Sequence, residues 1–182
     1  MKEKNLNLPN LLALLRLLMV PLVVYFIAQE DMLLAGGLFV TACFTDLLDG
    51  FIARRYSLTT RLGTWLDPFA DKLMAVSVVV TFTVKGILPW FVTVIIFFKE
   101  FLMLLGGFLA LKKGYTTPSN IFGKIASLML NAAIALGFLY RYVTPYYLWW
   151  TYVALVGSIA AFIQYAVKNY HLLFNTGEEK EE

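Results

Sequence analysis

The chain has 182 residues, of which 60% are hydrophobic and only 15% are charged, and its mean hydropathy is +0.73. This composition excludes a disordered protein and disfavours an ordinary soluble domain. The formal net charge of +3 is small and comes without a basic tract, so no nucleic-acid partner is expected. The single cysteine, Cys43, excludes an intramolecular disulfide, and we interpret it as a small packing residue in an apolar run.

Six stretches are long and apolar enough to cross a membrane as helices, since one crossing needs about 20 residues. In chain order they cover roughly residues 8–28, 33–53, 62–84, 88–110, 121–141 and 147–168. The first stretch contains Arg16 and lacks a cleavage pattern, which favours a retained helix over a signal peptide. The short connections predict one domain over residues 1–182, an all-α integral-membrane bundle of six spans. The acidic tail, residues 175–182, is expected to be disordered.

Lysine and arginine gather on one side of this predicted bundle. That side holds Lys2, Lys4, Arg54, Arg55, Arg61, Lys112, Lys113, Lys124, Lys168 and Lys180. The opposite side holds only Lys85 and Arg141. Because the loops richer in lysine and arginine face the cytoplasm, we expect both termini and the loop 54–63 on the cytoplasmic side. An even number of spans agrees with termini on one side.

Four aspartates fall within 26 residues around the turn between the second and third stretches, in the pattern D-x2-D-G-x2-A-R-x8-G-x3-D-x3-D. Asp46 and Asp49 are three residues apart, and Asp67 and Asp71 are four apart, so each pair shares one face of its helix. Two adjacent antiparallel helices can therefore point all four carboxylates into a common space. A charge inside a membrane segment costs roughly 2.5–3.5 kcal/mol on insertion scales, and hard divalent cations would offset that cost.

The residues between the aspartates favour a ligand site over a set of interfacial ion pairs. Gly50 lets a ligand approach the helix backbone beside Asp49. Arg54 lies two turns from Asp46 and could hold a phosphate with both arms of its guanidinium. Pro68 disfavours helical geometry at the residue before it, which predicts a kink or an irregular turn there.

The pattern matches the signature of the CDP-alcohol phosphotransferase family at every fixed position, and the six-span layout extends this resemblance over nearly the whole chain. The resemblance implies an enzyme that displaces CMP from a CDP-linked donor with an alcohol. It implies that the four aspartates hold two divalent ions, Mg²⁺ or Mn²⁺, with Asp71 as the general base that takes the proton of the alcohol. It assigns CDP binding to Gly50, Ala53, Arg54 and Gly63. A homodimer is also implied.

Further stretches resemble the bacterial phosphatidylglycerophosphate synthases of this family. They are Asn7 to Asn10 followed by Arg16, Asp67 to Leu73, Lys99-Glu100-Phe101 and Phe122-Gly123-Lys124. This resemblance implies CDP-diacylglycerol as donor and glycerol 3-phosphate as acceptor, in a bacterial cytoplasmic membrane with the site facing the cytoplasm. The residues expected to receive the acceptor phosphate are Lys124, Lys112, Lys113, Arg16 and Lys99.

Several alternatives stay open. Cardiolipin synthases share the Leu-Asp-Pro-x-Ala-Asp-Lys run, so phosphatidylglycerol is the main rival acceptor, and inositol phosphate or serine acceptors also occur in the family. Lys99 and Glu100 could instead form an internal ion pair, Arg16 could neutralise a carboxylate, and Lys124 could be only a topology signal. A cation transporter is disfavoured, because the acidic residues lie near one membrane face and no acidic series crosses the other spans.

Overall fold

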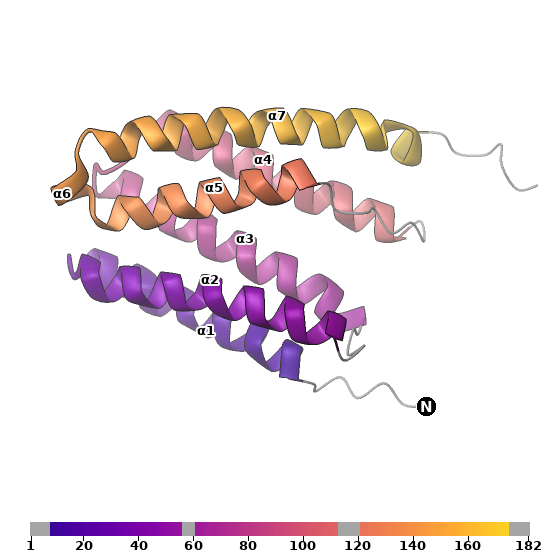
Figure 1. The fold of residues 1–182 in the computed structure, drawn as a ribbon, viewed down its shortest axis with the longest axis horizontal. Helices are drawn as coiled ribbons and strands as arrows, with labels where there is room; N and C mark the ends of the chain where they lie inside the picture. The colour runs from indigo at the N-terminus through magenta and orange to yellow at the C-terminus, as the bar shows by residue number, and fades with distance from the viewer. Residues whose placement is uncertain (1–7, 56–60, 113–120, 175–182) are drawn as a thin grey trace, which may run out of the picture.

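The computed structural model describes residues 8–55, 61–112 and 121–174, and these residues form helices without any strand. The helices are α1 (Leu8–Ala28), α2 (Met32–Arg55), α3 (Arg61–Val84), α4 (Trp90–Lys112), α5 (Ile121–Phe138), α6 (Tyr140–Val143) and α7 (Tyr146–Phe174). The six long helices run up and down alternately, and α6 is a single turn between α5 and α7 (Figure 1). Each predicted stretch coincides with one long helix to within a few residues, except that α7 continues beyond residue 168.

Five of these helices are long and apolar enough to span a membrane, which makes the chain an integral membrane protein. Their spanning segments are Asn10–Ala28, Met32–Ile52, Trp90–Ala110, Ile121–Phe138 and Tyr146–Lys168. The remaining long helix, α3, has 24 residues, but Asp67, Asp71 and Lys72 lie in its first half. Composition alone therefore does not mark α3 as a span, and a sixth crossing stays a prediction.

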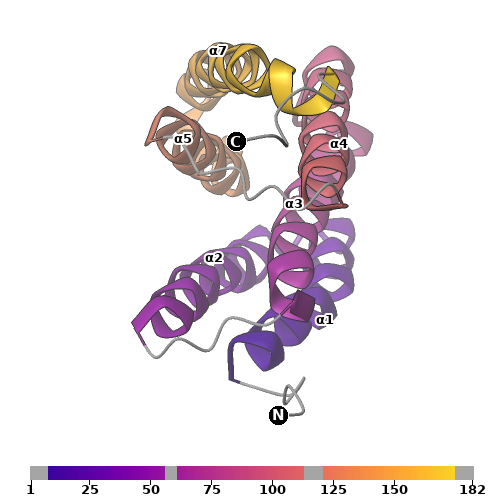
Figure 2. The same cartoon turned by 90° about the vertical axis from the view of Figure 1, so that its right-hand side faces the viewer.

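The helices pack as two groups that meet along α3. In Figure 2, α1, α2 and α3 lie together on one side, and α4, α5 and α7 on the other. α3 contacts both α1 and α4, and α2 contacts α5. Val23, Phe39, Val78 and Phe82 are buried between these helices, while large apolar side chains also cover the outer surface. An apolar core inside an apolar exterior suits a bundle surrounded by lipid.

One end of the bundle carries α6 and a small exposed ion cluster (Figure 1). Arg141 Nη2 lies 3.0 Å from Glu30 Oε2, and Lys85 donates a hydrogen bond to the carbonyl of Ala28. Hydrogen bonds with the Tyr140 hydroxyl and with Glu30 raise the pKa of Arg141, which stays charged. The described beginning of α1 and the end of α7 both lie at the other end, because six long helices alternate in direction between them (Figure 1). That this end faces the cytoplasm stays a prediction.

The second half of the aspartate motif lies on an unbroken helix. α3 is helical from Arg61 to Val84 and contains Pro68, so no irregular turn interrupts it at Asp67. The expected irregular turn was wrong, because the packing of α3 against α1 and α4 outweighs the local preference of the residue before a proline. The predicted acidic tail lies outside the described residues.

Candidate active site

Arg16 joins the first two aspartates of the motif. It lies in the middle of α1, its side chain is 1% exposed, and its Nη1 is 2.7 Å from Oδ1 of Asp46. Its Nη2 donates a hydrogen bond to Oδ2 of Asp49. Because Asp46 and Asp49 are three residues apart on α2, one planar guanidinium reaches both. The predicted shared face of this pair is confirmed.

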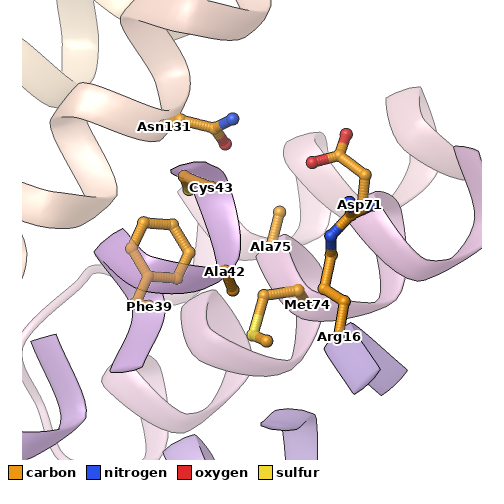
Figure 3. A pocket seen from close by; sticks show the side chains of 8 residues that line it. All are labelled: Arg16, Phe39, Ala42, Cys43, Asp71, Met74, Ala75 and Asn131. Carbon is orange, nitrogen blue, oxygen red and sulfur yellow. The ribbon is translucent and has the colours of Figure 1, made fainter. Parts of the chain in front are cut away.

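The two aspartates of α3 approach the same guanidinium. Asp71 lines a small pocket together with Arg16, with room for about one water molecule (Figure 3). Asp67 is half-buried and lies one helical turn before Asp71 on α3. The Oδ1 atom of Asp67 is buried and accepts no hydrogen bond from the residues that the structure describes. Arg16 thus contacts Asp46 and Asp49 directly and shares a pocket with Asp71.

The wall of this pocket includes polar atoms from a fourth helix. Figure 3 shows Arg16 reaching towards Asp71, with Cys43 of α2 and Asn131 of α5 across the pocket. Phe39, Ala42, Met74 and Ala75 complete the lining. The sequence analysis did not single out Asn131, although an amide in an otherwise apolar stretch is a signal that could have found it. Cys43, interpreted as a packing residue, is half-buried at the same wall.

A second charged cluster continues from Asp71. Lys72 Nζ lies 3.7 Å from Oδ2 of Asp71 and 2.7 Å from Oε2 of Glu100. The other oxygen of Glu100, whose side chain is 2% exposed, lies 2.5 Å from Nζ of Lys99. Lys99 also donates a hydrogen bond of 2.7 Å to Oγ of Ser158. One buried carboxylate is therefore held by two ammonium groups, and the cluster links α3, α4 and α7.

Two of the five residues expected to receive the acceptor phosphate already form ion pairs inside the bundle. Lys99 forms the internal ion pair that was its alternative role, and Arg16 neutralises carboxylates while it lines the pocket. Lys124 is exposed in the first turn of α5. Lys112 is the last residue of α4, and the structure does not describe its side chain. Lys113 lies outside the described residues. A phosphate-binding role for each of these residues stays a prediction.

The residues expected to contact CDP follow the aspartates along the same two helices. Gly50 is half-buried next to Asp49 on α2, and Ala53 and Arg54 come one turn later, with side chains outside the described set. Gly63 is buried in the first turn of α3. Their positions border the aspartates, as the motif requires, and their contact with CDP stays a prediction.

The carboxylates fit a divalent cation by their chemistry, although they do not enclose one. Among the described residues, no three Asp, Glu, His or Cys side chains are grouped closely enough to hold a metal ion, and Arg16 occupies Asp46 and Asp49 instead. The donors are nevertheless hard oxygens, and Asp67 offers a buried acceptor without a hydrogen bond. Among the described residues, carboxylates outnumber cationic side chains in the two clusters, and divalent cations would offset this negative charge.

Comparison with known proteins places this site in a family context. Residues 6–160 match the sequence model of the CDP-alcohol phosphatidyltransferase family. CDP-diacylglycerol–glycerol-3-phosphate 3-phosphatidyltransferase of Aquifex aeolicus is 29% identical over 176 residues, which cover 93% of this chain and 99% of that protein. The probable phosphatidylglycerophosphate synthase of Mycobacterium tuberculosis is 36% identical over 138 residues, covering 71% of this chain and 65% of that protein. Cardiolipin synthase (CMP-forming) of Homo sapiens is 33% identical over 120 residues, covering 65% of this chain and 40% of that protein.

The matched segment runs from the start of α1 into α7 and includes every helix that contributes to the two charged clusters. It covers most of the chain, so the resemblance drawn from the aspartate motif is confirmed. The protein belongs to the CDP-alcohol phosphatidyltransferase family.

Proposed function

We propose that this protein transfers the phosphatidyl group of CDP-diacylglycerol to glycerol 3-phosphate, giving phosphatidylglycerophosphate and CMP. As a family member it is a phosphatidyltransferase that releases CMP, and the proposal concerns the acceptor. The observation that carries it is the similarity to the Aquifex aeolicus enzyme, which bears the name of this reaction and aligns over 99% of its length. The human cardiolipin synthase aligns over only 40% of its length.

In the proposed reaction, a hydroxyl oxygen of glycerol 3-phosphate forms a bond to the phosphorus that carries the diacylglycerol. The bond from that phosphorus to the oxygen bridging to CMP breaks, and CMP leaves with the electron pair. Asp71 takes the hydroxyl proton. This role is supported by its place at the pocket and by its side chain being 29% exposed, since a general base must come within hydrogen-bonding reach of the proton.

The family uses divalent metal ions, and we propose that Asp46, Asp49, Asp67 and Asp71 hold two of them, Mg²⁺ or Mn²⁺. Such ions offset the negative charge of the pyrophosphate and of the leaving CMP. Gly50, without a side chain, leaves the surface of α2 open beside Asp49 for the CDP moiety. Ala53, Arg54 and Gly63 are proposed to border the same moiety.

We further propose that α3 is a sixth span and that the motif end of the bundle faces the cytoplasm of a bacterial cell. The support is the excess of lysine and arginine in the connections at that end. Glycerol 3-phosphate and CMP are soluble, so a cytoplasmic site gives both of them access. Lys124, Lys112, Lys113, Arg16 and Lys99 are candidates for the acceptor phosphate, and the enzyme is proposed to act as a homodimer.

The acceptor is tested with purified protein in detergent, supplied with CDP-diacylglycerol and Mg²⁺ or Mn²⁺. CMP release is measured with glycerol 3-phosphate, phosphatidylglycerol, inositol phosphate or serine as the acceptor. We expect glycerol 3-phosphate to react at least about tenfold faster than the others, equivalent to about 1.4 kcal/mol of discrimination, and chelation by EDTA to abolish the release. Faster release with phosphatidylglycerol would instead identify a cardiolipin synthase.

A further inference from the structure

Arg16 carries a positive charge inside the membrane-spanning part of α1, where an uncompensated charge is costly. Among the residues that the structure describes, every ion pair of Arg16 is with an aspartate of the motif. The guanidinium contacts Asp46 and Asp49 and shares a pocket with Asp71. Arg16 is therefore the direct counter-ion of Asp46 and Asp49, with Asp71 at the same pocket.

A guanidinium and a divalent cation bind carboxylates through the same oxygen atoms. Arg16 engages one oxygen of each carboxylate, Oδ1 of Asp46 and Oδ2 of Asp49. A divalent cation between these carboxylates must either take these oxygens from Arg16 or bind the remaining two beside its positive charge, and both weaken cation binding. We propose that Arg16 is an internal counter-ion that competes with the divalent cation for Asp46 and Asp49. The inference rests on the proposed metal role of these aspartates and is independent of the acceptor.

The counter-ion has a clear physical purpose in the absence of metal. Asp49 is 2% exposed and lies one helical turn from Asp46, and two such carboxylates repel each other when nothing positive lies between them. Arg16 removes that repulsion and keeps the pair on the face of α2 that a cation would need. The site is thus held in shape before metal binds, at the expense of weaker metal binding.

Displacement leaves the guanidinium in need of another anion. The phosphates of a CDP-linked donor supply one, in place of the acceptor phosphate for which Arg16 was a candidate, and arginine binds phosphate with two parallel hydrogen bonds. Transfer of Arg16 from the aspartates to the donor would couple the two ligands, because each would bind more tightly in the presence of the other. Arg16 is in this view a positioning residue that links metal binding to donor binding.

The competition is tested by Mn²⁺ binding to the full chain in detergent without nucleotide, with free Mn²⁺ measured by electron paramagnetic resonance. Arg16→Gln removes the competing charge and should bind Mn²⁺ about tenfold more tightly than the wild type. Arg16→Lys keeps a positive charge, but an ammonium group cannot contact both carboxylates at once. This variant should therefore bind Mn²⁺ about threefold more tightly than the wild type and less tightly than Arg16→Gln. Arg141→Gln, at the exposed opposite end, is the control and should leave the affinity unchanged.

Equal or weaker Mn²⁺ binding by Arg16→Gln would overturn the proposal, because the arginine would then support the cation site or lie apart from it. Thermal unfolding shows whether the variant folds. If Arg16→Gln gives no cooperative transition, Arg16→Lys decides, and Mn²⁺ binding no tighter than that of the wild type would overturn the proposal. A lack of saturable Mn²⁺ binding in all proteins would overturn the proposed metal role as well. An unexpected acceptor in the CMP assay would leave this inference intact.

Discussion

The four motif aspartates have different surroundings, and these differences suggest different roles. Asp49 is almost fully buried and hydrogen-bonded to Arg16, whereas Asp46 is 36% exposed and shares the same guanidinium. Asp71 is 29% exposed, and its nearest cation, Lys72, lies 3.7 Å away and is held more closely by Glu100. Asp71 therefore combines access from the pocket with only a 3.7 Å contact to a cation among the residues that the structure describes.

Asp71→Asn should lower CMP release at least about 100-fold, because general-base catalysis contributes about 10²–10⁴-fold and an amide cannot accept the proton. The measurement is the rate of CMP release from CDP-diacylglycerol with glycerol 3-phosphate. Asp31→Asn is the matched control, because Asp31 is exposed at the start of α2, where its side chain accepts a hydrogen bond from the backbone of Leu34. The base assignment fails if Asp71→Asn keeps the activity of that control.

At the scale of helices, α5 brings Asn131 to the pocket through a close approach to α3. Gly137 of α5 lies against the ring of Phe82, and a Cβ at this glycine would be 2.5 Å from Cε2 of that ring. Phe82 is fully buried and makes an edge-to-face contact with Phe138, so its ring has little freedom to move. The absence of a side chain at residue 137 thus sets how near α5 comes to α3.

Gly137→Ala should lower the free energy of unfolding by about 1–3 kcal/mol, the usual effect of overpacking a core. Gly106→Ala on α4 is the matched control, since a Cβ there would meet nothing within 4 Å, and alanine is the better helix former by about 1 kcal/mol. Thermal unfolding in detergent compares the two variants. Equal midpoints would show that Phe82 yields to the added methyl group and that the glycine is not required.

At the scale of the whole molecule, the two ends of the bundle differ in chemistry. The Glu30, Lys85 and Arg141 cluster lies at the end with α6. The last turns of α2, the first turns of α3 and the beginning of α5, where Lys124 is exposed, lie at the other end (Figure 1). A charge distribution of this kind is what orients membrane proteins. It leads to a direct test of the proposed orientation.

Single cysteines placed at the two ends should react from opposite sides of the membrane. In a Cys43→Ala background, Arg141→Cys should react with a membrane-impermeant maleimide added outside intact bacterial spheroplasts, and Lys124→Cys should react only after the cells are opened. Both positions are exposed, so access depends on the side of the membrane. Labelling of Lys124→Cys alone from outside would reverse the orientation, and labelling of both would contradict the placement of the two ends.

The sequence by itself determined the long helices, the spacing of the motif and the family. Hydropathy over about 20 residues and the spacing of Asp46 and Asp49 are local properties of the chain. In a helix, the apolar run sets the length of the span, and the three-residue spacing places both aspartates on one face. For the same reason the boundaries of the six stretches lie close to those of the six long helices. The motif also led to the CMP-releasing chemistry, which the family match confirms.

Only the tertiary structure decided which charges meet. Arg16 and Asp49 are 33 residues apart in the chain, and Lys99 and Ser158 are 59 apart. Such partners depend on how each helix is rotated and how deeply it packs against its neighbours, and no local pattern encodes either quantity. The same packing placed Asn131 at the pocket and kept α3 helical through Pro68. The aspartates could be found in the sequence, and so could an arginine able to neutralise a carboxylate, but which carboxylates Arg16 contacts became visible only when α1 was placed against α2.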